Sequence, residues 1–160
     1  MEPFPSNSQN PLPSGGVYVG EFAHALDGKR RITIPSDWRD VSGDSVFYVL
    51  PGIGEKCLYF FAESVMREKL RRLAAVSVTN AKAQSAMRSI FAAACRAVVD
   101  AHGRVRVTDS LLDYAGIRDE AVLVGVAGRF ELWNPETWNT LQQSRLSPDS
   151  LREAASFIGL

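Results

Sequence analysis

Apolar and polar residues alternate with a period of two in two short stretches, residues 32–34 and 105–107, and this period is typical of half-buried β-strands. Short apolar runs predict six further strands, at 17–22, 46–49, 57–60, 97–99, 122–124 and 130–133. Gly-containing segments at 51–54 and 125–128 separate two pairs of these runs, so each pair is expected to be joined by a turn.

Apolar residues spaced three and four apart predict helices over about 62–75 and 80–94, which would form a helical hairpin. Two shorter helices are expected to begin at Ser36-Asp37 and at Thr108-Asp109, since such residues cap helix N-termini. Asn134-Pro135 and Ser147-Pro148 predict helices over 135–143 and 148–157. Residues 135–160 should therefore be helical and self-packing, and the fold class is α+β.

The chain contains an internal duplication. At an offset of 73 residues, the segment 27–35 (DGKRRITIP) lies over 100–108 (DAHGRVRVT), and 57–60 lies over 130–133. Each copy contributes a short apolar run, an Asp-led turn, an alternating strand, a short helix and a pair of strands. Two or three short strands are marginal in water, so the two copies are expected to close one β-barrel together.

Composition is that of an ordinary globular protein, with 46% hydrophobic and 22% charged residues. Residues 1–16 are rich in Pro, Ser and Asn, and we expect a disordered tail there. No apolar run approaches the ~20 residues that span a bilayer, and the N-terminus lacks the pattern of a secretory signal. Cys57 and Cys95 stand singly in apolar runs, which favours buried free thiols in a reducing cytosol.

Catalytic chemistry finds little support in the residues. His24 and His102 are the two histidines available as general bases, and both precede or occupy turns, where structural roles are expected. The segment 52–56 (GIGEK) is too short for a phosphate loop and joins two strands rather than opening a helix. Asp27 and Asp100 precede turns that their carboxylates can lock. We expect no enzyme activity, no cofactor, no metal site and no small-molecule substrate.

The charges balance overall, with 18 basic and 18 acidic residues, but their distribution is uneven. Residues 56–96 carry eight Lys or Arg and two acids. Both copies also place cations at the same turn and strand: Lys29, Arg30 and Arg31 in the first copy, and Arg104 and Arg106 in the second. Such side chains can neutralise phosphates or reach guanine in the major groove, although ordinary solvated hairpin charges are the alternative.

The segment 24–35 followed by Arg39, and the later segments 99–105, 114–117, 122–125 and 129–133, resemble the two signatures of the MraZ family of bacterial AbrB-like regulators. The resemblance implies two SpoVT-AbrB modules interleaved in one double-split β-barrel. It implies a first module at 17–64, a helical connector at 65–94, a second module at 95–136 and C-terminal helices at 137–160.

The resemblance also implies a transcriptional regulator, expected to be a repressor of the division and cell-wall gene cluster. Its partners would be double-stranded promoter DNA with short direct repeats and further copies of itself in a ring-like homo-oligomer, on the nucleoid in the cytoplasm. Lys29, Arg31 and Arg104 correspond to the family's DNA-binding residues, and Arg30 and Arg106 join them as candidates.

Two departures from the family pattern affect the turns. Arg30 stands where the first turn of the family has glycine, so a φ above zero would be strained there unless the turn has changed type. Either the first copy presents an extra cation to DNA in an altered turn, or its operator preference has drifted. Thr108 and Leu112 replace the usual Pro and Arg of the second copy. The alternative function is a protein-interaction module of the AbrB-like antitoxin type, with weak or lost DNA binding.

Overall fold

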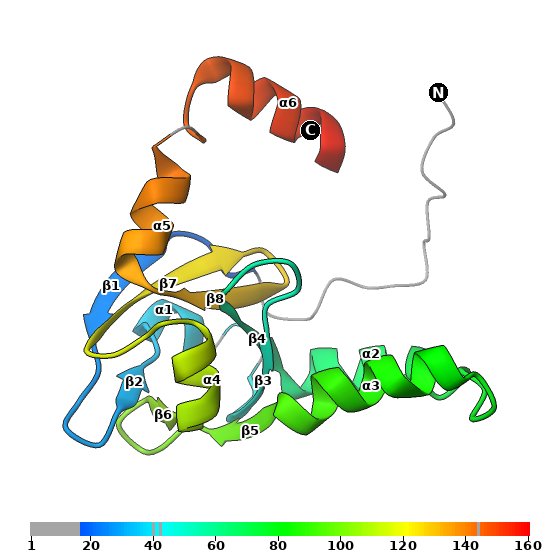
Figure 1. The fold of residues 1–160 in the computed structure, drawn as a ribbon. Coiled ribbons are helices and arrows are strands. Elements are labelled where there is room, and N and C mark those ends of the chain that lie inside the picture. Colours follow the sequence, from blue (N-terminus) through cyan, green and yellow to red (C-terminus); the bar gives the residue numbers. More distant parts are fainter. Residues whose placement is uncertain (1–16, 40, 42, 144) are drawn as a thin grey trace.

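A computed structural model describes residues 17–39, 41, 43–143 and 145–160, and the predicted tail at 1–16 lies outside them. The fold is α+β: a six-stranded antiparallel sheet, a separate two-stranded ribbon and helices around them (Figure 1). The sheet has the order β1-β7-β8-β4-β3-β5, and the ribbon consists of β2 and β6. The strands are β1 Glu21–Ala25, β2 Arg31–Thr33, β3 Val46–Pro51, β4 Leu58–Ala62, β5 Cys95–Val98, β6 Arg104–Arg106, β7 Glu120–Val126 and β8 Arg129–Trp133.

The strands of the two sequence copies are interleaved. β1 of the first copy pairs with β7 of the second, and β5 of the second copy pairs with β3 of the first. The remaining cross-copy pairs are β4 with β8 and β2 with β6. Because every strand of each copy pairs with a strand of the other, neither copy has a complete sheet by itself.

Backbone hydrogen bonds repeat across the duplication and give it an approximate twofold symmetry. The amide of Leu26 donates to Asp119 O, and the amide of Val99 donates to Ser45 O, each at 2.8 Å. Carried through the hairpins, this correspondence matches Leu58 with Phe130, both fully buried. β3 and β7 lie 74 positions apart, but the connection from Gly125 to Phe130 is two residues shorter than that from Pro51 to Leu58, so β4 and β8 lie 72 apart. The sequence alignment of 57–60 with 130–133 at an offset of 73 was therefore wrong by one residue, a slip that exchanges the two faces of a strand.

Aromatic side chains fill the centre of the core. The ring of Phe130 stacks on Phe60 at a centroid distance of 4.7 Å and contacts Trp38, Phe47 and Tyr18 at 5.1 to 5.3 Å. Such offset and edge-to-face contacts stabilise a core beyond the burial of apolar area. The two short helices, α1 Ser36–Arg39 and α4 Asp109–Tyr114, add buried Trp38, Leu111 and Leu112 to the same core.

The longer helices begin and end close to where the sequence predicts. They are α2 Glu63–Leu73, α3 Ala81–Ala93, α5 Pro135–Gln142 and α6 Pro148–Ile158. Side-chain oxygens of Asn80, Asn134 and Ser147 accept hydrogen bonds from amides in the first turns of α3, α5 and α6. α2 and α3 form a hairpin that projects sideways from the sheet (Figure 1).

Two expectations fail. The C-terminal region does not pack on itself throughout: Trp138 of α5 is buried, but α6 has no buried residue and stands away from the sheet, with Phe157 and Ile158 exposed (Figure 1). Its apolar face lacks a covering element in the described chain.

The second expectation concerns the two cysteines, which were both expected to be buried. Cys57 is fully buried, and burial raises the pKa of its thiol to about 12, whereas Cys95 is only half-buried because β5 forms an edge of the sheet.

No helix in the described chain is long and apolar enough to cross a membrane.

Candidate nucleic-acid interface

One aspartate organises each of the two turns that lead into the ribbon. The Asp27 carboxylate accepts hydrogen bonds from the amides of Lys29 and Arg31 at 2.9 and 2.8 Å, and from Nε of Arg31 at 2.7 Å. Asp100 accepts the corresponding bonds from the amides of His102 and Arg104 at 2.8 and 3.0 Å, and from Nε of Arg104 at 2.9 Å. The expectation that both aspartates lock turns is therefore confirmed.

These bonds favour the charged form of both carboxylates. The Arg104 amide, followed by further donors from His102 and Arg104, lowers the pKa of Asp100 from 3.8 to about 2. The Arg31 amide and side chain lower the pKa of Asp27 in the same way. Hydrogen bonds to a carboxylate stabilise its ionised form, so both turns are held by charged aspartates near neutral pH.

The short ribbon gathers the basic side chains on one face. In its register Arg31 lies opposite Arg106, Ile32 opposite Val105, and Thr33 opposite Arg104. Because successive side chains of a strand point to opposite faces, Ile32 and Val105 share the face that enters the core. The other face carries three arginines and a threonine.

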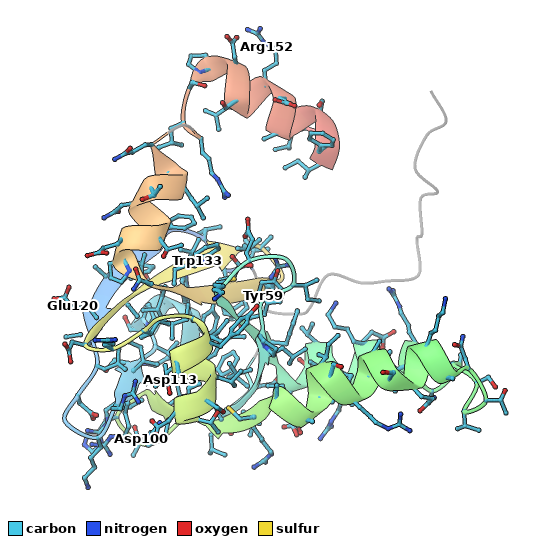
Figure 2. All side chains as sticks on the ribbon, in the orientation of Figure 1. Tyr59, Asp100, Asp113, Glu120, Trp133 and Arg152 are labelled. Atoms are coloured by element: carbon cyan, nitrogen blue, oxygen red, sulfur yellow. The ribbon has the colours of Figure 1, made fainter. Side chains whose placement is uncertain are left out.

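The two turns also approach each other across this face. NH1 of Arg31 lies 4.0 Å from Asp100, and NH1 of Arg104 lies 3.9 Å from Asp27. Two aspartates and two arginines thus form one charge cluster on the approximate twofold axis. In Figure 2, Asp100 marks this end of the molecule, and Arg152 on α6 marks the opposite end.

The predicted residues differ in how freely they present their charge. Lys29 is exposed at the tip of the first turn, and no ion pair to it occurs among the described residues. His102 occupies the matching tip of the second turn. The side chains of Arg31 and Arg104 are 28% and 29% exposed, and each bonds its aspartate through Nε.

Arg30 and Arg106 share one acidic partner. NH1 of Arg30 and NH2 of Arg106 donate to the same oxygen of Asp109, at 2.7 and 2.9 Å. These bonds, led by the one from Arg106, lower the pKa of Asp109. Arg30 has a φ of 58° and the matching Gly103 a φ of 77°, so the first turn keeps the left-handed conformation of the second rather than changing type.

Arg39 is a further basic residue at this surface that was named in the sequence signature but not among the candidate contacts. Its Nε donates to Ile34 O at 3.0 Å, and its guanidinium group lies against the backbone of Gly103. It is exposed, and it has no acidic partner within the described chain. The pairing of a basic residue in α1 with a glycine 64 positions later is a three-dimensional relationship, which periodicity in the sequence does not reveal.

The remaining polar candidates lie outside this cluster. His24 is exposed in β1, with Nδ1 2.8 Å from Ala25 O. The segment 52–56 connects β3 to β4, as expected for a turn. Within the described ranges, no group of three or more His, Cys, Asp or Glu side chains is placed to hold a metal ion.

The chain is similar in sequence to proteins of one known family. A family model described as "MraZ protein, putative antitoxin-like" matches residues 90–157. The chain is 34% identical to the transcriptional regulator MraZ of Clostridium beijerinckii and 35% identical to that of Clostridium acetobutylicum, covering 90% of this chain and 100% of each relative. It is 35% identical to the transcriptional regulator MraZ of Limosilactobacillus fermentum, covering 90% of this chain and 99% of that relative.

Proposed function

Because the chain belongs to the MraZ family, we propose that it is a DNA-binding transcriptional regulator that contacts duplex DNA through the β2–β6 ribbon and its two turns. The relatives are named as transcriptional regulators, in agreement with the expectation of a non-enzymatic protein. The observation that carries the assignment of the surface is the basic outer face of the ribbon, backed by buried Ile32 and Val105.

The aspartates give Arg31 and Arg104 a defined orientation toward the groove. Each guanidinium group is bonded through Nε, while its terminal nitrogens are at 3.9 Å or more from the other turn's aspartate. A guanidinium fixed at one edge loses less conformational freedom on binding. The outer edge of Arg31 can then donate two hydrogen bonds to O6 and N7 of guanine, as β-ribbon proteins do in the major groove. Arg104 can do the same once its NH2 leaves the 3.5 Å contact with Nδ1 of His102.

The two tips are suited to the phosphate backbone. Lys29 extends from the first tip without an acidic partner in the described chain, and His102 occupies the second. Phosphate contacts fix the position of a protein on DNA, whereas base contacts determine sequence preference. Lys29 is therefore the proposed phosphate contact, and Arg31 and Arg104 are the proposed base contacts. Arg106 lies at the margin, with its charge shared with Asp109.

The finer parts of the assignment follow the sequence resemblance. We propose a double-split β-barrel as the common frame of two modules at 17–64 and 95–136, joined by 65–94 and followed by 137–160. We also propose repression of the division and cell-wall gene cluster through short direct repeats, by a ring-like homo-oligomer on the nucleoid in the cytoplasm. Several equivalent ribbons on one oligomer would raise affinity for repeated sites through effective concentration.

The salt dependence of DNA binding tests the surface. Replacing Lys29 with Ala should weaken binding and lower the slope of log affinity against log salt by about one unit, because one phosphate contact releases about 0.9 counterion. Fluorescence anisotropy with a labelled duplex measures both quantities. Lys82→Ala, an exposed lysine on α3, is the matched control and should leave the slope unchanged. An unchanged slope for Lys29→Ala would remove the first tip from the interface.

The antitoxin-type interaction module is a second candidate, favoured by one observation. α6 exposes Leu151, Phe157 and Ile158 without a covering element in the described chain, and exposed apolar patches mark protein contacts. This candidate predicts that the purified chain binds duplex DNA weakly or not at all even at low salt, where electrostatic binding is strongest. A DNA complex whose affinity depends on Lys29 would exclude it as the sole function.

A further inference from the structure

Because the chain is duplicated, each position in one half of the interface has an equivalent position in the other half. Arg30 in the first turn corresponds to Gly103 in the second, and Arg39 in α1 corresponds to Leu112 in α4. α1 packs against the second turn and α4 packs against the first, so each turn faces the short helix of the other copy. One half thus combines a glycine in the turn with an arginine in the helix, and the other half combines an arginine in the turn with a leucine in the helix.

In the half formed by the second turn and α1, the turn has a glycine and the helix has an arginine. Gly103 is buried, and a Cβ atom built on it would overlap the guanidinium group of Arg39. That guanidinium group is fixed by the bond from its Nε to Ile34 O at 3.0 Å. A side chain at position 103 would therefore displace the Arg39 guanidinium group from this place.

In the half formed by the first turn and α4, the turn has an arginine and the helix has a leucine. The Arg30 guanidinium donates to Asp109 at 2.7 Å and to Ile117 O at 3.1 Å, and so joins the first turn to the start of α4 and to the segment that follows it. Leu112 is 1% exposed and points into the core. Val107 O, which corresponds to Ile34 O, accepts its bond from Arg106 instead of a helix arginine.

We propose that Arg30 is a positioning residue: together with Leu112 it replaces, in one half of the interface, the contact that Arg39 and Gly103 make in the other. A guanidinium group joins turn to helix in both halves, but it comes from opposite partners. Mixed combinations are disfavoured for two different reasons. Arginine at both positions crowds the site, and glycine with leucine leaves the turn without its hydrogen bonds to the α4 region.

Given the function proposed above, the positioning of the first turn by Arg30 also affects DNA binding. The Arg30 charge is shared with Asp109 and lies 4.0 Å from Asp113, so it is partly neutralised within the protein. Arg30 then holds the first turn in place while Lys29, beside it, meets the DNA. The second turn has a glycine, Gly103, at the matching position, and the exposed Arg39 lies against it.

A double-mutant cycle without DNA tests the exchange. Leu112→Arg should lower the folding equilibrium constant by about 100-fold in the wild-type background, the range typical of overpacked cores. In the Arg30→Gly background the same substitution should cost at least about tenfold less, because the space over the turn is then open. Urea unfolding followed by circular dichroism measures both. Folding of the double variant where Leu112→Arg alone fails to fold gives the same support, and equal losses in both backgrounds would overturn the proposal.

The salt slope of DNA binding separates positioning from contact. Arg30→Gly should change affinity but keep the wild-type slope, whereas Lys29→Ala should lower the slope by about one unit. A slope lowered by one unit in Arg30→Gly would make Arg30 a phosphate contact and overturn the positioning role. If Lys29→Ala also left the slope unchanged, the proposed interface would fail while the cycle without DNA still decided the exchange.

Discussion

Ile32 lies directly opposite Val105 at the middle of the β2–β6 ribbon, and both side chains are at most 2% exposed. They are equivalent residues of the two sequence copies, so the approximate twofold axis passes between them. Their burial determines which face of the ribbon enters the core. It therefore also determines that Arg31, Arg104 and Arg106 share the outer face.

Shortening this central pair should loosen the ribbon. Ile32→Ala is expected to lower the free energy of unfolding by about 2 to 4 kcal/mol, because it removes buried methyl and methylene groups and leaves a cavity. Val98→Ala, at a half-exposed position in β5, is the control and should change it by less than about 0.5 kcal/mol. Urea unfolding measures both, and similar small effects would show that the ribbon is not anchored through Ile32.

The aspartate-locked turns predict a specific loss of stability in acid. The folded-state pKa of Asp100 is about 2, below the ordinary 3.8, so its contribution is fully present above about pH 4. It is lost as the pH falls toward 2, when the carboxylate is protonated. Asp100→Asn should therefore be less stable than wild type at pH 6, and the difference should shrink between pH 4 and 2. Urea midpoints across this range measure it; a difference independent of pH would contradict the assignment.

Replacing Arg31 should distinguish a contact with a base from a contact with the DNA backbone. Arg31→Ala is expected to relax preference at one base pair by about 1 to 3 kcal/mol if it reads a base, or to lower the salt slope by about one unit if it contacts a phosphate. Because the substitution also removes the partner of Asp27, circular dichroism should first show that the fold is kept. Arg152→Ala, on α6 at the far end, is the matched control. Binding equal to wild type in affinity, slope and sequence preference would remove Arg31 from the interface.

An ion pair on β8 joins the half-buried Arg129 to the buried Glu131. Glu131 is 7% exposed and accepts bonds from Arg129 at 3.1 and 2.8 Å and from Nε1 of Trp133 at 3.1 Å, and the Arg129 guanidinium lies over the Tyr59 ring. Glu131→Gln should lower the free energy of unfolding by about 1 to 3 kcal/mol, because the charged donor loses its counterion. Combining it with Arg129→Met should recover part of the loss. Additive losses in urea unfolding would argue against the pairing.

The sequence was sufficient where the determinants are local or repeated. The period of two at 32–34 and 105–107 predicted the two strands of the ribbon, the caps at Asn134 and Ser147 predicted the last two helices, and the duplication predicted that the copies complete their β-structure together. The partners of Arg30 could not be predicted in this way, since Asp109 lies 79 residues away and meets it only after the copies interleave. The exposed face of α6 was also missed, because an amphipathic pattern indicates an apolar face without saying what covers it.

Selection of bound fragments from a pool of random duplex DNA tests the central claim most directly. The account predicts that the full chain recovers short sequences containing guanine, repeated in the same orientation, and that Lys29→Ala and Arg31→Ala reduce this recovery while Lys82→Ala does not. Recovery of no enriched sequence, or enrichment unaffected by both substitutions in the turns, would contradict it.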